Sequence, residues 1–345
     1  MSDLLYGEVE EELRAGVREV LEDRADRQHV LAWTERGESH DAGLWTVLGK
    51  ELGVAGLPVP EELGGAGAGW RETAVVAEEL GRAVAPVPFL GCAVLGVAAL
   101  LASDDRDLLA AVAGGETVAT LAVPYGAPER PVRDGGVRGV ADALSADVLL
   151  LPREDGLYAY DASDVARTPV TTFDRTRPLA DLDFGGAQGR RVGGPEAVGR
   201  ALTVGAAILA SEQLGVAEQC LESTVAYAKT RYQFARPIGS YQAVKHRLAD
   251  LWVAVAQARA AARYAADCVA NDDPDTPVAV AIAQSHCSEV AVRAAEDCVQ
   301  LHGGIGFTWE HPAHLYLKRA KSLSLAFGGA HHHRAALGGL VGLTL

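Results

Sequence analysis

"YAKTRYQFARPIGSYQAVKHRLADLW", residues 227–252, decides how the second half of the chain is built. The stretch begins inside one helical pattern, is interrupted by Pro237 and Gly239, and continues as a second helical pattern. Proline and glycine interrupt helices, so the stretch predicts two helices joined by a short turn. Helices joined in this way lie side by side and antiparallel, as in a helical bundle.

Apolar residues recur at helical spacing on both sides of this turn. They predict bundle helices at residues 196–230, 241–271, 275–302 and 312–325. In the first third of the chain the same spacing predicts helices at residues 4–24, 41–53, 70–83 and 90–113. Between the two helical parts lie short β-rich runs separated by turn residues: "TVATLAVP", "ADVLLLP", "GLYAYDA" and "LADLDF".

The order of these patterns predicts a fold of the α+β class that is mainly α. We expect an N-terminal helical domain at residues 1–115, a small central β domain at residues 116–192, and a C-terminal four-helix bundle at residues 193–345. With 345 residues, of which 49% are hydrophobic, the chain can bury a full core.

The charge and the hydropathy of the chain limit the kinds of partner that it can bind. The net charge is -15 at pH 7, which argues against binding to nucleic acid or to an anionic membrane surface, because both need a basic face. No apolar run approaches the roughly 18 residues of a membrane-spanning helix. The N-terminus is acidic and amphipathic, unlike a secretory signal with its basic start. We therefore expect a cytoplasmic protein that binds neither nucleic acid nor membrane.

Two motifs in the C-terminal third are specific. Residues 227–252 contain Arg-x-x-Phe-x-x-x-Ile, and residues 297–322, "DCVQLHGGIGFTWEHPAHLYLKRAKS", contain Gln-x-x-Gly-Gly. Both motifs resemble the acyl-CoA dehydrogenase family, and "GLPVPEELGGAG" and "AEELGRAVAPVPF" look like the N-terminal helices of the same family. The resemblance covers nearly the whole chain. It implies an FAD-dependent enzyme of lipid metabolism that oxidises an acyl-CoA thioester to its α,β-enoyl form.

The resemblance also implies a mechanism and a set of cofactor contacts. In this family a carboxylate removes the α-proton while the β-hydrogen leaves as hydride to the flavin N5 atom, so the base must lie within hydrogen-bonding range of the α-carbon. Arg231, Gln233 and Phe234 match family positions that reach the FAD pyrophosphate and adenine from a neighbouring subunit. The forked guanidinium of an arginine suits a pyrophosphate because it supplies paired donors.

The second motif and the last helix supply further candidate contacts. Gln300, Gly303 and Gly304 match the family segment where the backbone comes close to the cofactor, which favours residues without a β-carbon. The alternative is that "LHGGIGF" is an ordinary turn between helices. In "LAFGGAHHHR", residues 325–334, the two glycines predict the start of the last helix, and His331 is the histidine best placed to approach the cofactor.

No metal site is expected. Consecutive helical residues point about 100° apart, so the three histidines of "LAFGGAHHHR" cannot readily converge on one ion. The five cysteines form no CxxC pair, and we expect them to be small core residues.

The catalytic base of this family has no match in the chain. Alignment of residues 325–334 on the family pattern places Phe327 where the base is usually a glutamate, and counting back from Arg231 places Gly205 at the alternative position on the first bundle helix. Glu212 lies on the same helix face as Gly205, about 10 Å further along. We expect Glu212 to be a structural acid, and the catalytic residues stay unknown.

The chain therefore resembles the short partner subunit of actinobacterial heteromeric acyl-CoA dehydrogenases, in which a larger related chain carries the base. This resemblance implies an acyl-CoA substrate, bulky or steroid-derived, and assembly with the larger subunit or self-association as a dimer or tetramer. It also implies electron-transfer flavoprotein as a candidate electron acceptor. Two alternatives stay open. One is a self-sufficient flavoenzyme with another base or reaction in a biosynthetic pathway, and the other is a flavin-free scaffold with the same fold.

Overall fold

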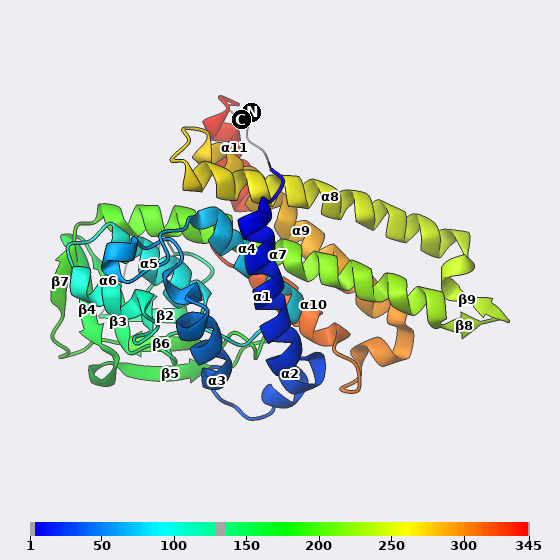
Figure 1. The fold of residues 1–345 in the computed structure, drawn as a ribbon, viewed down its shortest axis with the longest axis horizontal. Helices are drawn as coiled ribbons and strands as arrows, with labels where there is room; N and C mark the ends of the chain where they lie inside the picture. Colours follow the sequence, from blue (N-terminus) through cyan, green and yellow to red (C-terminus); the bar gives the residue numbers. More distant parts are fainter. Residues whose placement is uncertain (1–3, 129–134, 344–345) are drawn as a thin grey trace.

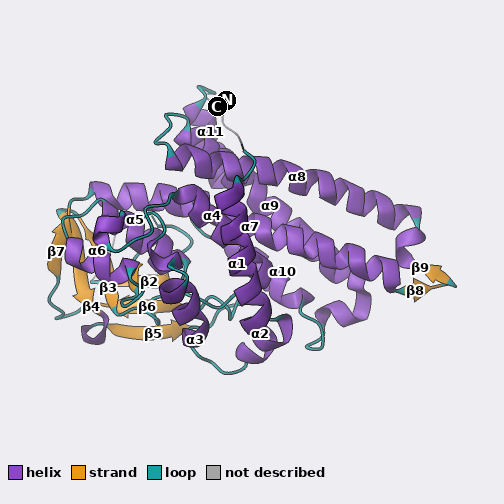
Figure 2. Cartoon of the chain, viewed as in Figure 1, coloured by secondary structure: helices purple, strands orange, loops and turns teal. Residues whose placement is uncertain are grey.

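The main group of strands lies at one side of the molecule, and helices make up most of the rest (Figures 1 and 2). The computed structural model describes residues 4–128 and 135–343. The first helical part contains α1 (Glu8–Arg24), α2 (Arg27–Trp33), α3 (Ala42–Trp45), the helical turns η1 (Thr46–Glu51), η2 (Val54–Gly56) and η3 (Glu61–Leu63), α4 (Trp70–Ala83), η4 (Leu90–Gly96), α5 (Val97–Leu101) and α6 (Arg106–Ala113).

The strands and the second helical part follow. The strands and their one helical turn are β1 (Ala119–Leu121), β2 (Gly136–Ala141), β3 (Val148–Arg153), β4 (Gly156–Asp161), η5 (Ala162–Asp164), β5 (Ala166–Val170), β6 (Leu179–Asp183) and β7 (Arg190–Gly193). The second helical part contains α7 (Glu196–Thr230), β8 (Tyr232–Gln233), β9 (Arg236–Pro237), η6 (Ile238–Ser240), α8 (Gln242–Ala270), α9 (Thr276–His302), η7 (Gly303–Phe307), α10 (Ala313–Leu323) and α11 (Ala330–Leu340).

Most of the predicted elements are confirmed. The helices expected at residues 70–83 and 196–230 have those bounds as α4 and α7, and the other predicted bundle helices differ by one or two residues at their ends. The helix expected at 90–113 is wrong in one respect, because Ala102–Asp105 separates α5 from α6. The sequence patterns missed α2 and the strands β2, β5, β7, β8 and β9. The domain division at residues 115 and 192 stays a prediction.

The strands form two sheets that enclose a small core of their own. One sheet has the order β1-β3-β4-β7 and the other has the order β2-β6-β5. Successive side chains of a strand point to opposite faces, so Leu149 and Leu151 on β3 join the core between the sheets, while Leu150 joins the main core with the helices. Tyr160 and Phe184 meet edge to face inside the small core, 4.9 Å between ring centroids. The four-stranded sheet is therefore buried on both faces.

The main core is centred on α7, which runs the length of the bundle and contacts α4, α8 and α9 (Figure 1). Its middle is buried on every side, as expected for a helix that is apolar and small all round. Two glycines let α4 and α7 touch: a β-carbon added at Gly215 would lie 1.9 Å from the carbonyl oxygen of Glu78, and one added at Gly81 would lie 2.2 Å from that of Glu212.

Gly215→Ala is expected to destabilise the protein by about 1–3 kcal/mol, because the added methyl group must push α4 and α7 apart. Gly199→Ala is the matched control in the same helix. Gly199 is exposed with nothing within 4 Å of its added β-carbon, so alanine there should stabilise the helix by about 0.5–1 kcal/mol. Urea unfolding measures both changes, and equal shifts in the two variants would contradict the close helix contact.

Among the residues described, no helix is both long enough and apolar enough to cross a membrane. The five cysteines are buried free thiols, which confirms their expected place in the core.

Candidate cofactor and active site

The first predicted cofactor motif forms a small hairpin at the far end of the bundle (Figure 1, right). β8 pairs with β9, and the two residues between them, Phe234 and Ala235, have φ values of 52° and 62°. Positive φ at both central residues is the requirement of a tight two-residue hairpin turn. Phe234 stands at this tip with 89% of its surface exposed, so its ring is presented to another molecule rather than to its own core.

Arg231 lies at the base of the hairpin with its guanidinium available to an outside anion. In the described part of the chain, no acidic side chain forms an ion pair with it. Its neighbour Arg236 is held differently, with its guanidinium carbon 3.8 Å from the centroid of the Tyr241 ring. The Tyr241 hydroxyl donates to the Gln233 carbonyl oxygen at 3.3 Å, which braces the hairpin. An exposed, unpaired arginine fits the pyrophosphate of FAD.

The second motif ends α9 at the same end of the bundle. Gln300 is exposed, and Gly303 terminates the helix with φ of 64°, a left-handed conformation that favours glycine. A β-carbon added at Gly303 or Gly304 would meet nothing within 4 Å. Both glycines are therefore open to solvent and leave the backbone accessible to a ligand.

Aromatic stacking joins the two motifs. The rings of Tyr227 on α7 and His302 on α9 stack with centroids 4.3 Å apart, and His311 lies 4.4 Å beyond His302. The Tyr227 hydroxyl donates to the His302 carbonyl oxygen at 3.4 Å, and His302 Nδ1 lies 2.7 Å from the Cys298 carbonyl oxygen. Sequence reasoning assigned no role to Tyr227 or His302. The signal in the sequence was their position: His302 lies inside the Gln-x-x-Gly-Gly motif, and Tyr227 lies one helical turn before Arg231.

His331 is not brought to the other six candidates. It is exposed in the first turn of α11, which packs against α9 and whose Arg334 pairs with Glu289 of that helix. Glu289 precedes Gln300 by about 17 Å along the helix. A contact of His331 with the same cofactor molecule would need a site shared between two chains, and it stays a prediction. Among the described residues, no group of three histidine, cysteine or acidic side chains is arranged to hold a metal ion.

The two positions where the family resemblance would place a base face each other. A β-carbon added at Gly205 would lie 2.5 Å from Leu95 Cδ2 and 3.1 Å from Phe327 Cζ. Phe327 is buried, with φ of 54°, and its backbone N–H donates to the Tyr125 carbonyl oxygen at 2.9 Å. The space between the two positions is therefore filled by a phenyl ring and a leucine side chain, neither of which can accept a proton.

Glu212 is bound on both sides by buried arginines. Arg177 Nη2 lies 2.8 and 3.0 Å from the two carboxylate oxygens, and Arg319 Nη1 also donates to the carboxylate. Arg319 Nε donates to Asp174 at 2.7 Å, and its Nη2 donates to Thr176. We call Asp174, Thr176, Arg177, Glu212 and Arg319 the buried ion cluster.

The charges in this cluster keep Glu212 ionised. Burial by itself raises the pKa of the Glu212 carboxyl, but the positive charges of Arg177 and Arg319 and their hydrogen bonds lower the pKa below its ordinary value. A carboxylate stabilised in this way is a weak base. The structural role expected for Glu212 fits this geometry.

The sequence and the fold of this chain were compared with those of known proteins. Residues 7–103 match the model of the acyl-CoA dehydrogenase N-terminal domain, and residues 193–338 match that of the C-terminal domain. The chain is 39% identical to acyl-CoA dehydrogenase IpdE2 of Mycobacterium tuberculosis over 89% of each chain. It superposes on a chain of the ChsE4–ChsE5 complex from Mycobacterium tuberculosis with a TM-score of 0.91, 30% identity and full coverage of both chains. For the Tcur3481–Tcur3483 steroid ACAD the TM-score is 0.86, with 32% identity over 97% of this chain and 98% of the other.

Proposed function

We propose, from the premise that this chain belongs to the acyl-CoA dehydrogenase family, that it is one subunit of a hetero-oligomeric acyl-CoA dehydrogenase. It completes the FAD site of a larger related chain and carries no catalytic base of its own. FAD is the cofactor of the family, and it accepts the hydride from the substrate when bound. The residues of this chain contribute to holding the cofactor.

The observation that carries this proposal is the filled space between Gly205 and Phe327. A base must lie within hydrogen-bonding range of the proton that it removes. Here both candidate positions lack a carboxylate, and the nearest acid on the same helix face, Glu212, is bound by two arginines. The proton of the substrate is then removed by a carboxylate of the partner chain.

The distance between the filled space and the hairpin supports the assignment to two chains. The rise of an α-helix places Arg231 about 39 Å from Gly205 along α7. Arg231, Gln233 and Phe234 therefore point away from the molecule at a site remote from its own filled space. Together with Gln300, Gly303 and Gly304 they hold the FAD of a neighbouring chain in this proposal, and the ChsE4–ChsE5 complex supports a heteromeric assembly.

The substrate that we propose is a bulky, steroid-derived acyl-CoA thioester. The likeness to a protein described as a steroid ACAD supports this substrate class. Electron-transfer flavoprotein is the proposed acceptor of the electrons.

Co-expression with the larger acyl-CoA dehydrogenase-like chains of the source genome tests the proposal. The chain purified alone is expected to retain little flavin, while the complex is expected to be yellow and to oxidise acyl-CoA. The measurements are the flavin absorption spectrum and the flavin content per chain.

The alternatives give different results in the same experiment. A yellow, active homo-oligomer with about one flavin per chain would identify a self-sufficient flavoenzyme and overturn the proposal. A complex that keeps its full activity when Arg231 is replaced by alanine would identify a scaffold.

A further inference from the structure

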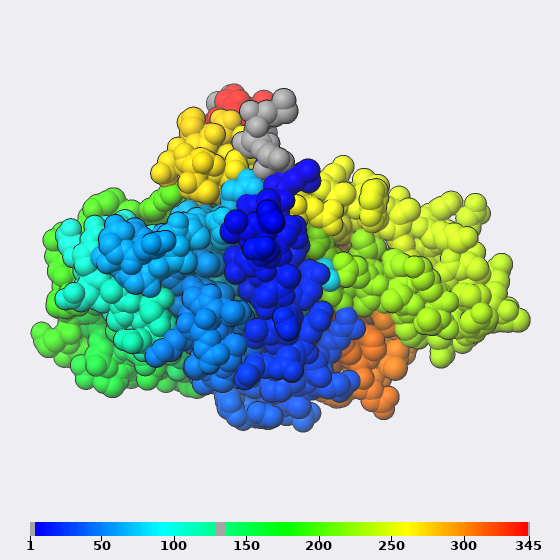
Figure 3. Space-filling model, in the orientation of Figure 1, coloured from blue at the N-terminus to red at the C-terminus, as the bar shows by residue number. Residues whose placement is uncertain are grey.

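A pocket that neither cofactor motif uses lies where α1 and the start of α2 meet α4, α7 and α10. Its volume is about 530 Å³, and its lining includes Leu21, Arg27, Glu79, Ala83, Gln219 and Tyr316. Figure 3 shows the blue N-terminal helices beside the green and orange parts of the bundle. Small-molecule sites commonly enclose roughly 300–1,000 Å³, so this pocket has the size of a ligand site. We call it the α1–α7 pocket.

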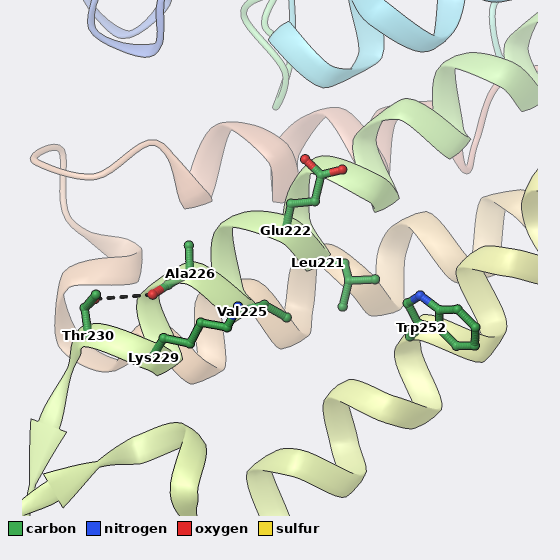
Figure 4. Close-up of a pocket in the computed structure, with 7 residues that line it drawn as sticks. All are labelled: Leu221, Glu222, Val225, Ala226, Lys229, Thr230 and Trp252. Carbon is green, nitrogen blue, oxygen red and sulfur yellow. Dashed lines mark hydrogen bonds between the residues drawn. The ribbon is translucent and has the colours of Figure 1, made fainter.

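Gln219 on α7 presents an amide without a partner to this pocket. The residue is only 8% exposed, yet no hydrogen bond joins its side chain to any described residue. Buried polar side chains normally have a hydrogen-bond partner, so this amide can donate to and accept from a bound molecule. The groove on the outside of α7 and α8 differs, because the Thr230 hydroxyl there donates to the Ala226 carbonyl oxygen at 3.3 Å (Figure 4).

Arg27 brings a positive charge to the α1–α7 pocket. It is the first residue of α2, and in the described part of the chain no acidic side chain forms an ion pair with it. Burial raises the pKa of the Tyr316 phenol, and the positive charge of Arg27 opposes this effect. The guanidinium therefore lies close to the Tyr316 side of the pocket.

The two other arginines that line the pocket already have acidic partners. Arg18 donates to both carboxylate oxygens of Glu79, at 2.7 and 2.9 Å. Arg82 donates to the carboxylate of Glu222 at 3.0 Å. Among the described arginines of the pocket, Arg27 is thus the one left to pair with a ligand.

The acids of the pocket limit the charge that a ligand can carry. Glu22 and Asp26 line the pocket and are exposed. Because like charges repel, a doubly charged phosphate would face these two carboxylates with one unpaired cation to balance it. A carboxylate carries a single charge that matches Arg27, and its two oxygens suit the paired donors of a guanidinium. The charges therefore favour a carboxylate.

We propose that the α1–α7 pocket binds a small molecule with one carboxylate on an apolar body. The carboxylate accepts from the Arg27 guanidinium and the Gln219 amide. The apolar body lies against Leu21, Ala25 and Ala83. This site is separate from the proposed function, because it includes no residue of the two cofactor motifs and needs no second chain.

Octanoate tests the inference when it is titrated into the full chain by isothermal calorimetry. It is expected to bind at one site per chain and more tightly than octanol or inorganic phosphate. Arg27→Met should raise the dissociation constant about tenfold or more, because hydrogen bonds to a charged group are lost. Gln219→Leu should raise it as well. Arg24→Met is the matched control: its side chain is 53% exposed in the last turn of α1, outside the pocket, and the constant should change less than about twofold.

Four results would overturn the inference. Octanoate may show no saturable binding, or its binding may be the same in Arg27→Met as in Arg24→Met. Octanol that binds as tightly as octanoate shows that the pocket does not recognise the charge, and phosphate that binds more tightly contradicts the carboxylate. Circular dichroism checks the fold of each variant, and if Gln219→Leu unfolds, the comparison of Arg27→Met with Arg24→Met decides. No flavin or partner chain enters the titration, so its result is independent of the proposed function.

Discussion

Arg319→Met is expected to lower the free energy of unfolding by about 3–5 kcal/mol, the range for breaking a buried ion pair by removing one partner. The Arg319 side chain is 1% exposed and donates to Asp174, Thr176 and Glu212. Methionine fills much of the volume but leaves two carboxylates short of donors. Urea unfolding of the free chain measures the change. Arg293→Met is the matched control: Arg293 is 49% exposed and 3.9 Å from Asp297, so its loss should cost about 0.5 kcal/mol or less.

The pH dependence of this difference checks its electrostatic origin. In the native protein the pKa of Glu212 is lowered, so its contribution to stability is present above the pKa of an unfolded glutamate and is lost as the pH falls through the folded pKa. Arg319→Met removes one of the two charges that lower this pKa. The gap in stability between the two proteins should therefore be largest at neutral pH and shrink in the acid range where carboxyl groups protonate. A gap that is constant over this range would assign the loss to packing alone.

The fold could be predicted in large part from the sequence because its helices are long and strongly periodic. α4 and α7 have the predicted bounds: Gly69 directly precedes α4, and α7 ends at Thr230, shortly before the break at Pro237 and Gly239. β5 was missed because four of its five residues are exposed and it contains Pro169, so it lacks the alternation of a half-buried strand. A strand at the edge of a sheet can have this composition.

The site was less predictable because it depends on contacts between distant segments. Phe327 and Gly205 were each identified as positions without a base, but no sequence pattern indicates that they touch. The same holds for Arg177 and Arg319, which lie in separate segments and meet only at Glu212. Local motifs report which residues are present, whereas the placement of a buried charge depends on the packing of α7, α10 and the strands together.

Arg231→Ala is expected to weaken flavin binding by the assembled complex on the order of 100-fold. Truncation of a guanidinium that donates two hydrogen bonds to a pyrophosphate should lower the binding free energy of the flavin by about 3 kcal/mol. Hydrogen bonds to charged groups contribute roughly 1.5–3 kcal/mol each. The side chain is exposed at the base of the hairpin and has no acidic partner among the described residues, so its removal should not disturb the free chain. Flavin fluorescence during dilution of the complex measures the release.

Two controls separate loss of the cofactor contact from loss of assembly. Arg138→Ala removes an arginine whose side chain is 90% exposed in β2, far from the hairpin in the fold, and should leave flavin binding unchanged. Arg231→Lys keeps the positive charge but not the paired donors of the guanidinium. If these paired donors bind the pyrophosphate, the complex with Arg231→Lys should bind flavin clearly more weakly than the native complex. If Arg231→Ala releases subunits and flavin together, its role is in assembly. If the subunits stay together while the flavin leaves, Arg231 acts on the cofactor directly.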